Sequence, residues 1–293
     1  MREKLAVSER RACEVLGQPR STQRYAPQED EEERRLVKQM LELVREHPRY
    51  GYRRITARLQ QDGWTINRKR VYRLWLQEGL KVPKKQRKKR AIGNRDGACQ
   101  QRQALHKDHV WTWDFIFDRT ANGRSVKILS IVDEFTRECL ALEVSHKFKA
   151  SDVIDVLADL FVIRGVPKHI RSDNGPEFVA QAIRRWLKRA GVEVLYITPG
   201  SPWENGFVES FHSRLRDECL SLEVFDNVKH AQALVASWRS DYNHRRPHSS
   251  LGYQTPAAFA AGCLASASAT PALQPDSRSD EEQTLSIPQT VLS

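Results

Sequence analysis

The sequence is poor in cysteine and has no long apolar run. Its five cysteines (Cys13, Cys99, Cys139, Cys219 and Cys263) are odd in number, widely spaced and never paired as CxxC. This pattern argues against a disulfide framework or a thiolate zinc site and favours a reducing compartment. No stretch approaches the 18 apolar residues of a membrane span, and MREKLAVSERR has no apolar signal core. We therefore expect a soluble, intracellular protein.

Acidic residues are scarce relative to basic ones only in the front of the chain. Residues 1–110 hold 28 Lys and Arg against 14 Asp and Glu, whereas residues 111–293 hold 20 against 23. The net charges are therefore +14 and −3. A basic front half joined to a slightly acidic back half favours an anchor for a polyanion, of which a nucleic-acid backbone is the usual case. The alternative from charge alone is a merely soluble basic protein.

The basic half has the pattern of short amphipathic helices. Leu36, Met40 and Leu43 fall on one helical face, and Gly63 ends the next segment. Asn67 is a suitable N-cap for a helix that follows. Helix, short connection and helix predict a helix-turn-helix domain over residues 31–83. The cations predicted to contact DNA are Arg53, Arg54, Arg68, Lys69, Arg70 and Arg73.

Three other segments flank the predicted domains. Residues 1–30 predict part of another helix-turn-helix, with a helix in SERRACEVLG. Residues 84–105 begin with KKQRKKR and predict a flexible basic linker able to lie along a nucleic-acid backbone. Residues 264–293 are rich in Ser, Ala, Pro and acids, and predict a disordered tail. For the cations predicted to contact DNA in the helix-turn-helix domain, the alternative is a basic helix face exposed only to solvent.

From about residue 106 the pattern changes to strands. HVWTWDFIF, VKILSIVD and CLALEVS predict three consecutive strands at 109–117, 126–133 and 139–145. Helix, a short strand in VPKHIRSD, helix, a strand at 192–197 and two further helices, from about 204 and from 227 to 243, follow. This order predicts an α/β fold of the ribonuclease H-like type over residues 106–263, a mixed five-stranded sheet with helices on both faces.

Three carboxylates stand out in this arrangement. Asp114 lies inside the first predicted strand between Trp113 and Phe115, where a charge is costly without a partner. Asp173 ends the fourth strand, and Glu209 begins a helix 36 positions later. Three converging carboxylates suit hard cations such as Mg²⁺ or Mn²⁺. With two such ions and one phosphodiester the charges sum to zero, and a two-metal site of this kind activates the attacking oxygen and stabilises the leaving one.

Neighbouring polar residues need separate interpretation. Glu177 heads a predicted helix, and Glu204 lies about 140° around the helix from Glu209, so both are interpreted as structural. Asp133 and Glu134 follow a strand and are interpreted as turn residues. Arg216, two turns after Glu209, predicts a DNA-phosphate contact, with a surface salt bridge to Asp217 or Glu218 as the alternative.

The blocks WTWDF, RSDNGPEF and SPWENGFVESFHSRLRDE resemble those of DDE transposases and of the retroviral-integrase core. The 35 residues between Asp173 and Glu209 are the usual spacing of that core. SERRACEVLG, YGYRRITARL and YNHRRPHSSLGYQTPAAF resemble, more narrowly, the second-frame OrfB proteins of bacterial insertion sequence family three. The resemblance spans roughly residues 7 to 260. It implies that Asp114, Asp173 and Glu209 are the catalytic, metal-binding carboxylates.

The resemblance also implies an activity and its partners. Water activated at two Mg²⁺ or Mn²⁺ ions would cut the element end to expose a 3′-OH, which would then attack target DNA without a covalent protein–DNA intermediate. The expected partners are the terminal inverted repeats, target DNA, further copies of the chain, and an upstream-frame protein or a frameshift fusion with it. The expected location is the bacterial cytoplasm, on the nucleoid, with no membrane contact.

Two other functions fit parts of the pattern. A ribonuclease H-type nuclease usually enlists a fourth carboxylate, and no acid in the sequence has an obvious claim to that role. A catalytically silent DNA-binding regulator would not need three acids in matched contexts. Joining of a 3′-OH end to target DNA separates both from a transposase.

Overall fold

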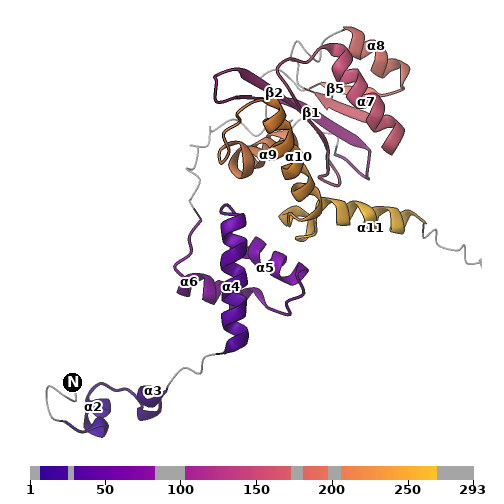
Figure 1. The fold of residues 1–293 in the computed structure, drawn as a ribbon. Coiled ribbons are helices and arrows are strands. Elements are labelled where there is room, and N and C mark those ends of the chain that lie inside the picture. The colour runs from indigo at the N-terminus through magenta and orange to yellow at the C-terminus, as the bar shows by residue number, and fades with distance from the viewer. Residues whose placement is uncertain (1–6, 26–29, 83–102, 173–180, 197–205, 269–293) are drawn as a thin grey trace, which may run out of the picture.

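The computed structural model of the chain describes residues 7–25, 30–82, 103–172, 181–196 and 206–268. It has a helical part, followed by a part built on a β-sheet (Figure 1). No helix among these residues is both long and apolar enough to cross a bilayer. The helices of the first part are α2 (Glu9–Val15), α3 (Arg20–Arg24), α4 (Glu31–Glu46), α5 (Tyr52–Gln61) and α6 (Arg68–Gln77).

Helices α4, α5 and α6 share one apolar core. The apolar residues of α4 recur every three or four positions, so that Leu36, Met40 and Leu43 are buried together. They pack against apolar side chains from α5 and α6, such as Leu59. As the sequence predicts, the Asn67 side chain caps α6 by accepting a hydrogen bond of 2.8 Å from the Arg70 backbone. The helix-turn-helix pattern is confirmed.

The sheet is mixed and has the strand order β3-β2-β1-β4-β5. The first three strands form an antiparallel meander, and β4 and β5 join it by parallel pairing. The predicted fold class is thus confirmed, with strand limits that differ by up to three residues, the largest difference being at the start of β4. The strands are β1 (Val110–Arg119), β2 (Ser125–Asp133), β3 (Cys139–Ser145), β4 (His169–Ser172) and β5 (Glu193–Tyr196).

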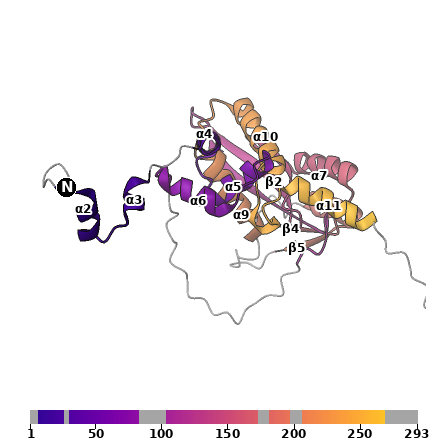
Figure 2. The same cartoon turned by 90° about the horizontal axis from the view of Figure 1, so that it is seen from below.

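Helices cover both faces of the sheet, as Figures 1 and 2 show. On one face, α7 (Ala150–Arg164) and α8 (Gln181–Arg189) pack over Trp113 and Phe115 of β1. On the other face, α9 (Gly206–Leu215) and α10 (Val228–His244) pack over Ile116. Because side chains alternate along a strand, Asp114 shares the face of Ile116 and is directed toward the side of α9.

The helix that carries Glu209 is not one continuous α-helix. α9 ends at Leu215 and continues as a π-helical turn, η3 (Arg216–Leu220), where the sequence predicts an unbroken helix from about residue 204. Apolar periodicity does not distinguish the two, because a π-turn of five residues is too short to show a period of its own in the sequence. After α10, a short 3₁₀ turn, η4 (Ser249–Leu251), leads into α11 (Pro256–Ser268).

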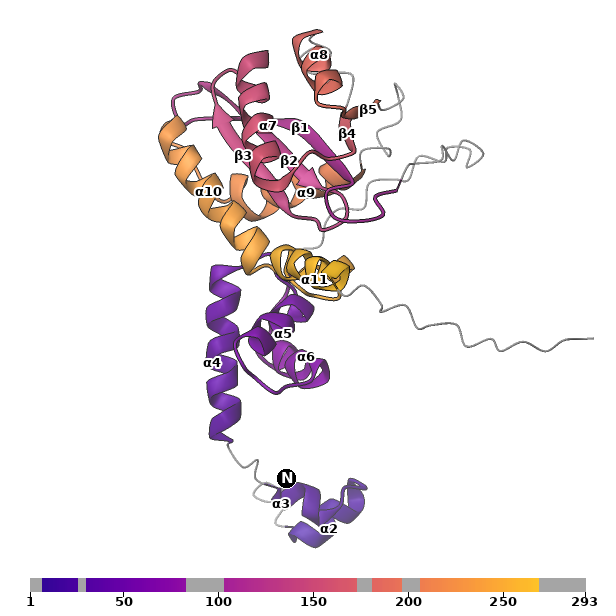
Figure 3. The same ribbon diagram turned by 90° about the vertical axis from the view of Figure 1, so that its right-hand side faces the viewer.

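A buried ion pair of the sheet part lies where the helical part contacts it. Arg246, which follows α10 and is 1% exposed, donates two hydrogen bonds of 2.7 Å to the Glu218 carboxylate on η3. From the helical part, Arg54 reaches the same carboxylate at 3.4 Å, and the buried Tyr50 ring lies 5.9 Å from the Arg246 guanidinium. Figure 3 shows α4 and α5 beside the end of α10 at this junction. The contact fixes how the helical part meets the sheet part.

Glu218→Gln tests the strength of this junction. The substitution keeps the side-chain shape but leaves the buried Arg246 charge without a carboxylate. We expect the free energy of unfolding to fall by about 3–5 kcal/mol, measured by urea denaturation. The exposed Glu223→Gln is the matched control and should change stability by less than about 0.5 kcal/mol. Equal losses in both variants would contradict the role of the pair.

Candidate active site

Asp114 lies in the middle of the central strand. It pairs with Ser130 of β2, and its own Oδ1 accepts a hydrogen bond of 2.7 Å from the Phe115 backbone N–H. Its side chain is 24% exposed, whereas the neighbouring Trp113 and Phe115 are buried on the opposite face. The carboxylate therefore reaches solvent from within an otherwise buried strand.

Helix α9 brings polar groups to Asp114. The Nδ1 atom of His212 lies 3.6 Å from Asp114 Oδ2, and its Nε2 atom lies 2.8 Å from the Ser130 hydroxyl. The same hydroxyl donates to the Asp114 carbonyl oxygen at 3.0 Å. Burial, aided by the charge of Arg216, lowers the pKa of His212 to about 3, so the ring is neutral at pH 7. The contact fixes the α9 face that meets Asp114.

Glu209 lies one helical turn before His212, and residues three apart lie on the same helix face. Its side chain is exposed. Asp173 lies outside the described residues, as do Glu177 and Glu204. In the sequence, Asp173 directly follows Ser172, the last residue of β4, and β4 pairs with β1.

The end of β4 is held by a buried ion pair. Arg171 donates to Glu134 at 2.7 Å, and both side chains are nearly inaccessible. Burial raises the pKa of the Glu134 carboxyl, and Arg171 opposes that shift. Glu134, which the sequence indicates to be a turn residue, is thus also a partner in this ion pair. Asp133 is a turn residue as expected, since its Oδ1 accepts hydrogen bonds from the Phe135 and Thr136 backbone N–H groups. No local sequence signal distinguishes the pair, because its members lie 37 positions apart.

The oxygen-rich character of the site suits a hard cation. Asp114 and Glu209 offer carboxylate oxygens that reach solvent, with Ser130 and His212 beside them. Among the residues that the structure describes, no three His, Cys, Asp or Glu side chains gather closely enough to hold a metal ion, and Asp173 is not one of these residues. The trio that the sequence predicts is therefore described for two of its three members.

The cations of α6 differ in their surroundings. Arg68 and Lys69 are exposed in the first turn. Arg70 instead pairs with Asp30 at 3.1 Å and Glu32 at 3.0 Å. Both acids belong to the start of α4, and the acidic segment therefore neutralises part of the predicted basic face. Arg73 is similarly engaged, at 2.7 Å from Glu33.

The remaining predicted DNA-binding residues also divide. Arg53 is exposed, and its Nε donates to the Tyr52 hydroxyl at 3.2 Å. Arg54 is partly buried against Glu218, so the structure gives it a place at the junction between the two parts of the chain. Arg216 is exposed at the first residue of η3, on the same helical rod as Glu209.

Comparison with known proteins identifies both parts of the chain. Residues 31–90 match the HTH-like domain, and residues 104–202 and 190–256 match two models of the integrase core domain. The HTH-like match contains α4, α5 and α6, and the two integrase matches together contain the sheet, α9 and α10.

Similar proteins come from bacterial insertion elements. The chain is 40% identical over 278 residues to the insertion element IS407 uncharacterized 31.7 kDa protein of Burkholderia multivorans, covering 94% of this chain and 98% of that one. It is 39% identical to the insertion element IS476 uncharacterized 39.2 kDa protein of Xanthomonas euvesicatoria, over 89% of this chain and 75% of the relative. The transposase for insertion sequence element IS904 of Lactococcus lactis is 27% identical, over 80% and 96%.

These matches agree with the fold and with the motif blocks in the sequence. They cover nearly the whole length of the relatives from IS407 and IS904, including the helical part and the sheet part. An integrase core acts on DNA strands, and an HTH-like domain binds DNA. The chain belongs to the insertion-sequence transposases of family three, enzymes that cut and join DNA during transposition.

Proposed function

We propose that Asp114, Asp173 and Glu209 together form the catalytic site for cutting the element end and for strand transfer. The observation that carries the proposal is the 3.6 Å contact between His212 and Asp114, because it puts the Glu209 face of α9 over the central strand. Asp173 directly follows Ser172 of β4, and the parallel pairing of β4 with β1 supports grouping Asp173 with Asp114.

The residues fit two divalent cations, Mg²⁺ or Mn²⁺. Three carboxylates contribute −3, which with one phosphodiester balances the +4 of two ions. When bound, the ions would polarise the reacting phosphodiester and stabilise the attacking and leaving oxygens. Asp114 and Glu209 would hold these ions, while Ser130 and His212 connect α9 to the strand that carries Asp114. No covalent bond between protein and DNA is part of this scheme.

DNA binding by the helical part is proposed to rest on the exposed cations Arg53, Arg68 and Lys69. Arg70 and Arg73 serve mainly to hold α6 against α4, because each already has carboxylate partners. Arg216 is proposed to contact a DNA phosphate beside the catalytic carboxylates, on the rod that carries Glu209.

The proposed organisation extends to the rest of the chain. The boundaries predicted from the sequence give a partial helix-turn-helix, a helix-turn-helix domain, a basic linker, a catalytic core and a tail. Assembly of several copies on DNA, and joint action with an upstream-frame protein, belong to the same proposal. The motif blocks that resemble family three support it.

Glu209→Gln tests the third carboxylate. The substitution keeps the size of the side chain but removes one negative charge that faces the cations. We expect cleavage and strand transfer to fall about 100-fold or more in a labelled-end joining assay with Mg²⁺. Binding to terminal-repeat DNA should stay near normal. Glu223→Gln is the matched control, and full activity of Glu209→Gln would refute the assignment.

The combined variant Arg68→Gln/Lys69→Gln tests the DNA-binding face. Removal of each phosphate-binding cation should lower the slope of log affinity against log salt by about 0.9. Filter binding at several salt concentrations measures that slope. Lys229→Gln, an exposed cation on α10, is the control and should leave the slope unchanged. The same slope in the double variant and in the wild type would rule out phosphate binding by the start of α6.

A further inference from the structure

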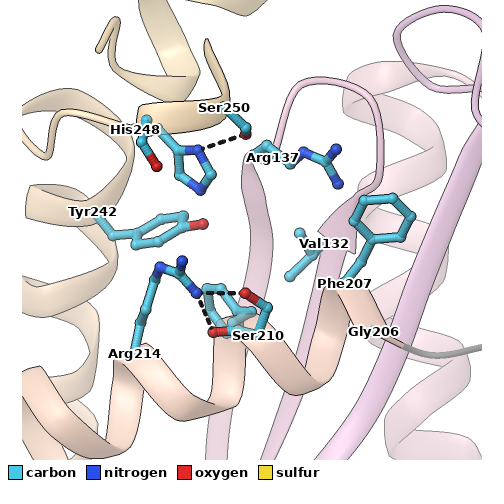
Figure 4. A pocket seen from close by; sticks show the side chains of 11 residues that line it. Val132, Arg137, Gly206, Phe207, Ser210, Arg214, Tyr242, His248 and Ser250 are labelled. Atoms are coloured by element: carbon cyan, nitrogen blue, oxygen red, sulfur yellow. Dashed lines mark hydrogen bonds between the residues drawn. The ribbon is translucent and has the colours of Figure 1, made fainter. Parts of the chain in front are cut away.

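A pocket of about 360 Å³ lies along α9, the helix that carries Glu209 (Figure 4). Three segments far apart in the sequence form it: the start of α9, the turn between β2 and β3, and the chain from the end of α10 to η4. Ser210 lines the pocket and directly follows Glu209, so the two sites lie on adjoining faces of one helix. The side chains that carry the argument are Arg137, Phe207, Ser210, Arg214, Tyr242 and His248.

The pocket is positively charged. Arg137 and Arg214 line it, and no carboxylate does so among the residues that the structure describes. Arg137 Nη1 and Arg214 Nε are buried without a hydrogen-bond acceptor within that part of the chain. Buried donors are normally satisfied, so two unsatisfied guanidinium N–H groups at one pocket indicate a missing acceptor.

The surrounding charges reinforce this field. The pKa of His248 is lowered to about 3, first by burial and then by the charges of Arg246, Arg214, Arg137 and Arg54. The imidazole is therefore neutral, and its Nδ1 atom shares a hydrogen bond of 2.9 Å with the Ser250 hydroxyl. Glu218 neutralises Arg246 from the far side, which leaves Arg137 and Arg214 as the cations that face the cavity.

Backbone strain at Arg137 is a second, independent observation. Its φ is +64°, in the left-handed region where Gly or Asn is favoured over a long side chain. Its N–H donates to the Asp133 carbonyl at 2.9 Å and closes the turn. The guanidinium is carried over the Phe207 ring, 4.0 Å from its centroid, at the pocket (Figure 4). An unfavourable conformation that directs a cation into a cavity is typical of a functional position.

We propose that this pocket binds one backbone phosphate of the DNA strand that enters the active site, with Arg137 and Arg214 as its ligands. The proposal rests on the proposed function, since the strand is placed by the Glu209 site on the adjoining face of α9. The planar guanidinium of an arginine can donate two parallel hydrogen bonds to the oxygens of a tetrahedral phosphate, so two arginines suit a phosphate ligand. The half-buried Phe207 offers aromatic surface to the attached nucleoside.

The test is a scan of neutral phosphates. Terminal-repeat duplexes that carry a single methylphosphonate at successive positions are bound to the full chain in EDTA, so that no DNA is cut. In the wild type, one position near the cleavage site should weaken binding about tenfold, as expected for a charge-assisted hydrogen-bonded contact. In Arg137→Asn, the unmodified duplex should bind about tenfold more weakly, and that same position should have no further effect.

Arg137→Asn also separates binding from folding. Asn tolerates the left-handed conformation, so its melting temperature should equal or exceed that of the wild type, whereas a merely structural Arg137 predicts a fall. Arg214→Lys should retain part of the affinity that Arg214→Gln loses. Arg185→Gln, an exposed cation on α8, is the control and should keep the wild-type methylphosphonate pattern.

Other outcomes overturn the proposal. A uniform loss at all methylphosphonate positions, or the same sensitive position in Arg137→Asn as in the wild type, excludes a phosphate seated in the pocket. Inorganic phosphate that raises the melting temperature of the wild type but not of Arg137→Asn, with unchanged DNA binding, would assign the pocket to a free anion instead. Failure of the Glu209 assignment alone is distinguishable, because Glu209→Gln would then remain active while the methylphosphonate pattern persists.

Discussion

Both faces of the central strand β1 must be covered by helices, because both carry large apolar side chains. Residues such as Trp113 and Phe115 build the core beneath α7 and α8, and Ile116 builds the core beneath α9 and α10. Alternation along the strand forces Asp114 onto the second face. A carboxylate tolerated there needs polar neighbours, and α9 supplies one in His212. The alternation of side chains along β1 thus determines both the packing of the sheet and the face on which the Asp114 carboxylate lies.

Much of this arrangement could be predicted from the sequence, because it depends on local rules. HVWTWDFIF predicts a strand with one acid, Asp114, among apolar residues. The Asn67 cap could be predicted because it depends only on residues next to it in the sequence. The strand order follows from the short connections of the meander and from the crossover through α7. The face of α9 that bears Glu209 and His212 follows from helical periodicity.

Contacts between distant segments could not be predicted in this way. A stripe of cations on α6 has the same pattern whether it faces solvent or the acids of α4, so the pairing of Arg70 with Glu32 needs three-dimensional information. The blocks containing Arg54 and Arg246 are each recognisable in the sequence, but that they meet at Glu218 is not. Buried ion pairs between residues far apart in the chain have no local signature.

The π-helical turn η3 lets side chains of α9 and η3 contact two different parts of the protein. An α-helix rotates by about 100° for each residue, and a π-turn holds one residue more per turn, so the residues after Leu215 are offset around the rod relative to a continuous α-helix. His212 before the turn contacts Asp114 of the sheet, while Glu218 within the turn contacts Arg246 and Arg54 of the helical part. The extra residue acts as a fixed angular offset. The rod that carries the candidate carboxylate thus also carries Glu218, through which the helical part contacts the sheet part.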